Sequence, residues 1–247
     1  MKTDSFLLGF YSSVLQLIFP NKCVCCGEII GEKEYLCGIC NRDIERIKVS
    51  KRCYRCGLEK QYCTCKKRVY YFESIISLFE YNGLAKDGIA KYKFGRRSHY
   101  GEFFATQMAL AVKNEYKDIK FDFICCVPTA KKSKQKYGFD HTKLLCEIMS
   151  DMLKIPMYCG ILKCNFSSSN QHTKSRNERF SNVSGKYCFT RKVKCKNVLL
   201  IDDIKTTGAT LDECAKQLLF AGADRVYCVT ALADIPNNTK LLKKETT

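Results

Sequence analysis

Apolar residues are spaced differently in each part of the chain, and the first region is an almost continuous apolar run over residues 6–19. This run is too short to cross a bilayer, which takes about 20 apolar residues. It also lacks the features of a secretory signal, because only Lys2 supplies a basic side chain before it and no small-residue cleavage site follows it. We predict an amphipathic helix over residues 1–20 that packs on the protein, with reversible membrane contact as the alternative. The chain is therefore expected to be cytoplasmic, with no transmembrane segment.

Residues 69–236 alternate between short apolar runs and amphipathic segments, as is typical of an α/β domain. Apolar runs of four to eight residues predict buried strands, and apolar residues every three or four positions predict helices. Strands and helices that follow one another through short connections favour a parallel sheet flanked by helices. Strands are expected at 74–81, 121–127, 196–201 and 225–232, and helices at 84–92, 100–116, 142–153 and 211–221.

Two stretches have no such period. Residues 165–185 are rich in Ser, Asn, Lys and Arg and predict a long mobile loop, and residues 237–247 predict a flexible tail. The 247 residues suffice for one medium domain and one small module. The expected organisation is a helix over 1–20, a cysteine-rich module over 21–68, an α/β domain over 69–236 and the tail.

The module over 21–68 is defined by its cysteines. Nine of the eighteen cysteines lie between residues 23 and 65, in a stretch with too few aliphatic residues for a core of its own. So many cysteines suit either a disulfide scaffold or a reduced, metal-binding protein, and the missing secretory signal favours the second. Three pairs have the spacing CxxC and a fourth has CxC. Each such pair directs two sulfurs at one metal, and two pairs complete a zinc tetrahedron.

The simplest zinc assignment follows the order of the sequence, although an interleaved arrangement is also compatible with the spacing. It gives one Zn²⁺ to Cys23, Cys26, Cys37 and Cys40 and a second to Cys53, Cys56, Cys63 and Cys65. Cys25 is then the spare thiol of the first pair, unless it exchanges roles with Cys26. Because protein ligands fill every position, we predict a double zinc ribbon whose ions are structural and not catalytic.

Residues 198–210 carry the second chemical signal. A predicted buried strand ends in Asp202 and Asp203, and a turn rich in Thr and Gly leads into a helix. Backbone N–H groups and hydroxyls of such a turn, together with the helix dipole, suit a phosphate monoester. Two carboxylates suit the vicinal hydroxyls of a ribose. A ribose 5-phosphate would satisfy both halves of the segment.

This segment resembles the phosphoribosyl-pyrophosphate loop of type I phosphoribosyltransferases, without a break from the strand to the start of the helix. The resemblance implies a type I phosphoribosyltransferase-like fold that binds phosphoribosyl pyrophosphate with Mg²⁺. It also implies that Asp202 and Asp203 hold the ribose hydroxyls. The 5-phosphate would be bound by Thr206, Thr207, Gly208, Ala209 and Thr210.

Further segments resemble the ComF family of DNA-uptake proteins. The segments are residues 126–129, residues 137–141, Gln171, Arg179 and residues 182–185. They are similar to the family's Val-Pro strand end, its Arg-Gly-Phe-Asn-Gln motif and its Gln, Arg, Asn-Val-x-Gly stretch. Tyr137, Asp140 and His141 depart from the second of these, where the family has Arg, Asn and Gln. With the cysteine module, the resemblance runs from the N-terminal helix to about Asp234.

The charge of the chain favours an anionic partner. There are 42 basic and 25 acidic residues, a formal net charge of +17. Lys131, Lys132, Lys134 and Lys136 follow a strand end, where ligands of parallel α/β sheets bind. Lys131 and Lys132 are therefore candidates to contact pyrophosphate oxygens, a single-stranded DNA backbone, or both. The cysteine module is also basic, with interleaved tyrosines that suit the stacking of unpaired bases.

Two functions follow from these features. The resemblance implies an accessory factor of natural transformation that handles incoming single-stranded DNA and binds phosphoribosyl pyrophosphate, with a DNA-uptake helicase or a recombination protein as candidate partner. The alternative is a Mg²⁺-dependent phosphoribosyltransferase of nucleotide metabolism or salvage, which would act by positioning and charge stabilisation. No residue set after Leu232 resembles a purine or pyrimidine reader, and this favours the accessory factor.

Overall fold

The computed structural model describes residues 20–63, 65, 68–95, 98–164, 183 and 185–235. Three predictions fall outside these residues: the helix before Pro20, most of the loop over 165–185, and the tail over 237–247. Gln171, Arg179 and Asn182, which carry part of the family resemblance, also lie outside them. Within the described residues, no helix combines the length and the apolar character needed to cross a membrane.

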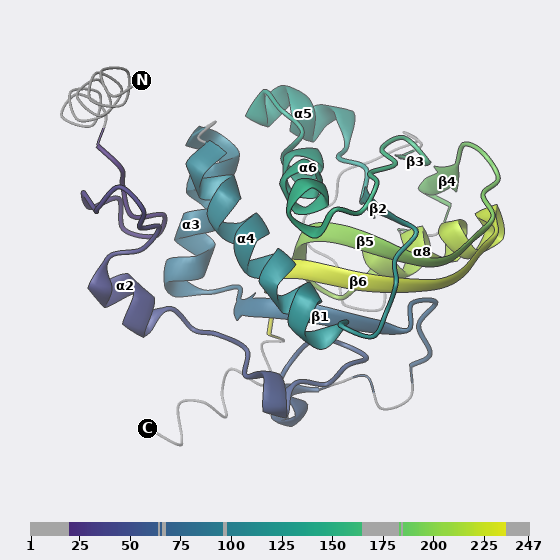
Figure 1. Ribbon diagram of the computed structural model, residues 1–247, viewed down its shortest axis with the longest axis horizontal. Coiled ribbons are helices and arrows are strands. Elements are labelled where there is room, and N and C mark those ends of the chain that lie inside the picture. The colour runs from purple at the N-terminus through teal and green to yellow at the C-terminus, as the bar shows by residue number, and fades with distance from the viewer. Residues whose placement is uncertain are drawn as a thin grey trace, which may run out of the picture.

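A parallel sheet of four strands lies at the centre of the chain (Figure 1). Its order is β1 (Ser74–Glu80), β6 (Ala223–Ala233), β5 (Cys195–Lys205) and β2 (Phe123–Cys126). The two central strands have eleven residues each, and their apolar stretches are buried without alternation. Such runs are expected where both faces of a parallel sheet are covered. The predicted sheet class is confirmed.

Helices cover both faces of this sheet. α3 (Gly83–Gly95), α4 (Ser98–Glu115) and α6 (His141–Leu153) lie on the near face in Figure 1, and α8 (Ala209–Ala221) lies behind the strands. The side chains of β5 alternate between the two layers, because Leu199 and Ile201 pack with the first group and Val198 and Leu200 pack with α8. The four helices predicted for the α/β domain are confirmed, with boundaries shifted by a few residues.

Three short elements of the α/β domain were not predicted. α5 (Lys131–Tyr137) forms where only a lysine run was recognised, and Gly138 ends it in the left-handed conformation, with φ of 77°. β3 (Leu162–Cys164) and β4 (Tyr187–Phe189) form a separate antiparallel pair. These two strands flank the segment that was predicted as a loop, so its two ends lie side by side.

The cysteine-rich module, with α2 (Gly38–Asp43), η1 (Val49–Lys51) and η2 (Lys60–Tyr62), packs directly on the α/β domain. In its first half, Val24 is fully buried and lies against Gly88 of α3. In its second half, Cys56 and Leu58 share an apolar cluster with Ala233 and Ile235 at the end of β6. Because the module lacks a core of its own, this shared packing stabilises it along with its metals.

Candidate functional site

The eight predicted zinc ligands gather into two groups of four sulfurs. The groups are Cys23, Cys26, Cys37 and Cys40, and Cys53, Cys56, Cys63 and Cys65. This is the grouping in sequence order and not the interleaved one. The Sγ atoms of Cys26 and Cys37 are 3.7 Å apart, and those of Cys56 and Cys63 are 3.6 Å apart. A tetrahedral site with Zn–S bonds of about 2.3 Å has edges of about 3.8 Å, so both groups fit Zn²⁺.

Cys25 is the thiol that neither group uses. It is 1% exposed, and burial raises its pKa to about 12, so it remains a neutral core thiol. In the CxC pair of the second ribbon, the Sγ atoms of Cys63 and Cys65 are 3.1 Å apart, closer than the 3.6 Å between Cys56 and Cys63. This is expected when only one residue separates two ligands of one ion.

Asp202 and Asp203 lie near the carboxyl end of β5, and both are almost completely buried. Although successive residues of a strand leave it on opposite faces, the two carboxyl groups still interact, because the charge and the side chain of Asp203 both raise the pKa of Asp202. Asp203 points toward α3 and α6, whereas Asp202 points toward Cys214 of α8 and Tyr187 of β4. A ribose bound by both residues would therefore lie at the end of the strand.

Asp203 is held by two basic side chains. Its Oδ2 lies 2.5 Å from Nζ of Lys93 and 3.2 Å from Nε2 of His141. Burial alone would raise the pKa of Asp203, but the hydrogen bond from His141 and the charge of Lys93 hold it well below its usual range. Burial alone would likewise lower the pKa of Lys93, but the charge of Asp203 outweighs it and the net shift is upward. The pair is therefore fully ionised at neutral pH.

Asp202 has no ion-pair partner among the described residues. Its Oδ1 accepts a hydrogen bond from the backbone N–H of Asp203, at 2.9 Å. Burial, followed by the negative charge of Asp203, raises the pKa of Asp202 well above the usual carboxyl value. A bound cation or ligand donor would offset both effects, which makes Asp202 the carboxylate with free coordinating capacity.

The predicted phosphate-binding residues form a bend between β5 and α8. Thr206 is exposed, and Thr207, Gly208 and Ala209 are buried, with Thr210 at the first turn of the helix. Gly208 has φ of 85°, and a Cβ there would lie 3.3 Å from Cε of Lys205. Among the described residues no side chain caps α8, although Oγ1 of Thr207 accepts from the N–H of Ala209 at 3.3 Å. The helix therefore begins with N–H groups that a phosphate could accept from.

Residues that follow the second ribbon form a wall beside this bend. The backbone N–H of Tyr71 donates to Oδ1 of Asp212 in the first turn of α8, at 2.7 Å. The ring of Tyr70 stacks on Phe72 and lies 3.8 Å from the position of a Cβ at Gly208. Residues 70–72, which follow the cysteine module directly in the chain, thus contact the predicted phosphate loop.

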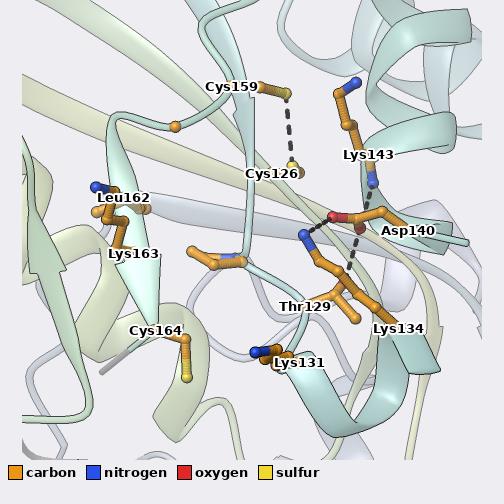
Figure 2. Close-up of a pocket in the computed structure, with 12 residues that line it drawn as sticks. Cys126, Thr129, Lys131, Lys134, Asp140, Lys143, Cys159, Leu162, Lys163 and Cys164 are labelled. Atoms are coloured by element: carbon orange, nitrogen blue, oxygen red, sulfur yellow. Dashed lines mark hydrogen bonds and ion pairs between the residues drawn. The ribbon is translucent and has the colours of Figure 1, made fainter. Parts of the chain in front are cut away.

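A cavity of about 400 Å³ opens at the carboxyl end of β2. Figure 2 shows Lys131, Lys134, Lys143, Thr129 and Asp140 around it. Nζ of Lys134 pairs with Oδ2 of Asp140 at 2.6 Å, whereas Lys131 is exposed and points into the cavity region. Lys132 is exposed on α5 but does not line the cavity. The structure therefore brings Lys131, and not Lys132, to the predicted rim.

The two departures Asp140 and His141 have clear structural roles. Oδ1 of Asp140 accepts from the N–H of Lys143 and caps α6, and it also accepts from Oγ1 of Thr129. His141, the first residue of α6, contacts Asp203 and so links α6 to the acidic strand. Sequence reasoning missed both roles, together with that of Lys93, although the departures from the family pattern marked the first two positions.

Known proteins resemble both parts of the chain. The Double zinc ribbon domain family matches residues 14–69. DNA utilization protein YhgH of Escherichia coli is 24% identical over 204 residues, which cover 78% of this chain and 89% of that protein. Competence protein F of Haemophilus influenzae is 25% identical, covering 84% and 95%. Competence protein ComFC of Bacillus subtilis is 26% identical, covering 59% and 58%.

A solved structure of adenine phosphoribosyltransferase aligns with 64% of this chain and 81% of its own, at 14% identity and a TM-score of 0.42. The similarity to the E. coli and H. influenzae proteins covers much more of the chain than the 14–69 match. It therefore extends well beyond the ribbons into the sheet domain.

Proposed function

We propose that this chain, a ComF-like protein with a phosphoribosyltransferase-type domain and a double zinc ribbon, binds phosphoribosyl pyrophosphate and Mg²⁺ at the end of β5. We further propose that it handles incoming single-stranded DNA in the cytoplasm as an accessory factor of natural transformation. The names of its relatives, which refer to competence and DNA utilization, support the second part. The geometry of the acidic strand supports the first.

The observation that carries the ligand proposal is the position of the acidic bend. In parallel α/β sheets, ligands bind beyond the carboxyl ends of the strands. Asp202, Asp203 and the bend lie at that end of β5, and the cavity lined by Lys131 lies at the same end of β2, its direct neighbour. The hydroxyls of a ribose need carboxylates, and its 5-phosphate needs N–H donors. A pyrophosphate group needs cations.

Mg²⁺ fits this site only together with the ligand. Mg²⁺ prefers one or two carboxylates combined with phosphate oxygens and water. Asp203 is already paired with Lys93, so Asp202 is the carboxylate that would hold the ion. Bound there, Mg²⁺ would neutralise charge on a pyrophosphate group, while Asp203 would keep Lys93 and His141 in place.

Single-stranded DNA would bind through exposed cations. Lys131, Lys132 and Lys136 are exposed on α5, beside the cavity, and the net charge of the chain is +17. Tyr54 is exposed and its ring lies under the guanidinium of Arg55 in the second ribbon, 6.0 Å from the centroid. Base stacking on such rings, combined with backbone neutralisation, suits binding without sequence preference. A helicase or recombination protein remains the candidate partner for the same basic surface.

Calorimetry with phosphoribosyl pyrophosphate and Mg²⁺ tests the ligand proposal. We expect binding by the full chain, and a loss of about 10- to 150-fold in Asp202→Asn, because a charge-assisted hydrogen bond contributes about 1.5–3 kcal/mol. Asp224→Asn is the matched control, since Asp224 is exposed at the amino end of β6. Unchanged affinity in Asp202→Asn would remove the ligand assignment. Release of pyrophosphate in the presence of a nucleobase would instead support the transferase alternative.

The DNA proposal is tested by the salt dependence of binding to a single-stranded oligonucleotide. Each lost phosphate contact should lower the slope of log K against log salt by about 0.7. The double variant Lys131→Gln, Lys132→Gln should therefore lose about 1.4 from the slope. Lys117→Gln with Lys120→Gln, at the amino end of the sheet, should leave it unchanged. A slope near zero in the wild type would contradict the proposal.

A further inference from the structure

A third cluster of cysteines lies outside the ribbons, in the α/β domain. The Sγ atoms of Cys126, Cys146 and Cys159 all lie within 4.8 Å of one another. Cys126 and Cys159 are 3.8 Å apart, and Figure 2 shows their side chains directed at each other across the top of the cavity. The three residues are far apart in the sequence, so no CxxC motif marks them.

The fold holds two of these cysteines in register. Residues 156–158 run parallel to β2, because the N–H of Ile124 donates to the carbonyl of Pro156 and the N–H of Tyr158 donates to the carbonyl of Ile124, both at 2.9 Å. Ile124 is thereby bridged to Met157. Cys126 and Cys159 are each two residues further along, so their side chains return to the same face of the sheet.

The third cysteine comes from the helix that covers that face. Cys146 is fully buried on α6, in the same apolar cluster as Ile124. The side chain of Asp140 caps the start of α6, and this helix packs on the sheet. Both features hold the sulfur of Cys146 in place. The cluster is therefore built from three separate segments: the end of β2, the turn at Cys159 and α6.

The spacing matches a metal site and not a disulfide. The distance of 3.8 Å between Cys126 and Cys159 equals the edge of a zinc–thiolate tetrahedron, about 3.8 Å, and lies close to the 3.6–3.7 Å found in the ribbons. A disulfide bond is about 2.05 Å long. Buried cysteines alone do not produce such a cluster, because Cys125, Cys214 and Cys228 share the opposite core and join no metal-binding group among the described residues.

We propose that Cys126, Cys146 and Cys159 bind a third Zn²⁺ through three thiolates and leave its fourth position open to the cavity. Thiolates select soft or borderline ions, of which Zn²⁺ takes three protein ligands plus an exchangeable one. Cys126 and Cys159 line the cavity whereas Cys146 lies behind it, so the free position faces the cavity.

The fourth ligand would come from solution. No further His, Cys, Asp or Glu among the described residues joins the group. Asp140, the nearest carboxylate lining the cavity, already pairs with Lys134 and accepts from Thr129. Lys131 and Lys143 line the same cavity, so water, hydroxide or a small anion would occupy the position. The three cysteines take no part in the proposed sugar-phosphate site, but the open position of the ion would face the cavity that this site shares.

Zinc content tests the proposal. The full chain, purified under reductant and dialysed against buffered Zn²⁺, should hold three ions per chain by elemental mass spectrometry. Cys126→Ser and Cys159→Ser should each hold two, while Cys188→Ser, a partly buried cysteine of β4 outside all three groups, should hold three. Two ions in the wild type, or three in both cluster variants, would overturn the site. Cys146→Ser is avoided because this residue is fully buried.

Cobalt provides a second measurement. With Co²⁺ in place of zinc, the wild type should show a larger sulfur-to-cobalt charge-transfer signal than Cys159→Ser. The difference should equal the contribution of the third site. Addition of azide should change the visible spectrum of the wild type but not that of the variant, because the ribbon ions have no exchangeable ligand. Equal spectra for the two proteins would overturn the metal site, and a wild-type spectrum insensitive to azide would overturn its open position.

Discussion

The ion pair between Lys93 and Asp203 gives the sharpest test of the structure. We consider Lys93→Met, which keeps much of the length and apolar stem of the side chain and removes its charge. Only 16% of the Lys93 side chain and 8% of the Asp203 side chain are exposed. The variant would therefore leave a buried carboxylate with His141 as its remaining partner.

The expected loss follows from this burial. Breaking a buried ion pair by removing one partner costs about 3–5 kcal/mol, because the other charge is left uncompensated. His141, at 3.2 Å, still donates to Asp203, so we expect the lower end, about 3 kcal/mol. At about 2–4 °C per kcal/mol for a chain of this size, the melting temperature should fall by about 6–12 °C.

Urea unfolding at a fixed Zn²⁺ concentration measures this loss, since bound metal itself stabilises the chain. Lys143→Met is the matched control, because it removes a lysine whose pair with Glu147 is exposed (48% and 41% for the two side chains). Such a pair contributes about 0–1 kcal/mol. The double variant Lys93→Met, Asp203→Asn should lose less than the sum of its single variants, since it buries no unpaired charge.

Two outcomes would refute the reasoning. If Lys93→Met cost less than about 1 kcal/mol, the carboxylate would have to be solvated in the native state, contrary to its burial. If Lys143→Met cost as much as Lys93→Met, the effect would come from general loss of positive charge and not from this contact.

Three further predictions concern the loop and the ribbons. Gly208→Ala should lower stability by about 1–3 kcal/mol in thermal denaturation, because a φ of 85° strains any residue with a Cβ; Gly38→Ala, in open space, should not. Chelation of zinc should lower the melting temperature of the whole chain, since the ribbons share packing with β6; a separate ribbon transition would contradict this. The raised pKa of Asp202 keeps it protonated at low pH, so affinity for phosphoribosyl pyrophosphate with Mg²⁺ should rise as pH increases through that pKa; calorimetry should show a weaker rise in Asp202→Asn.

The sheet could be predicted from the sequence because buried parallel strands are continuous apolar runs. The prediction ended β5 at residue 201, whereas the strand continues to Lys205. Asp202 and Ile204 still pair with Thr230 and Leu232 of β6. A hydrophobic pattern does not predict this backbone pairing, because polar residues interrupt the apolar run. The extension matters for the site, because it is what turns Asp202 and Asp203 to opposite faces.

The grouping of the eight ribbon cysteines could be predicted because its signal is local, whereas the partners of the acidic strand could not. Lys93 is one of many lysines, and only the packing of α3 on the sheet selects it. The strands β3 and β4 have three residues each, too few for a recognisable period. The cluster of Cys126, Cys146 and Cys159 has no spacing motif at all, since its members meet only in the folded chain.

The contact between residues 70–72 and the start of α8 has a consequence for regulation. Tyr71 is anchored to Asp212, and the chain on its other side leads directly to the cysteines of the second ribbon. Loss of the zinc ion of the second ribbon would release Tyr70 and Tyr71 from their positions, and the bend between β5 and α8 would lose these contacts. By linkage, a sugar phosphate bound at the bend would in turn raise the affinity of the second ribbon for its zinc ion. Loss of zinc would thus weaken the proposed binding of phosphoribosyl pyrophosphate as well as the stability of the chain.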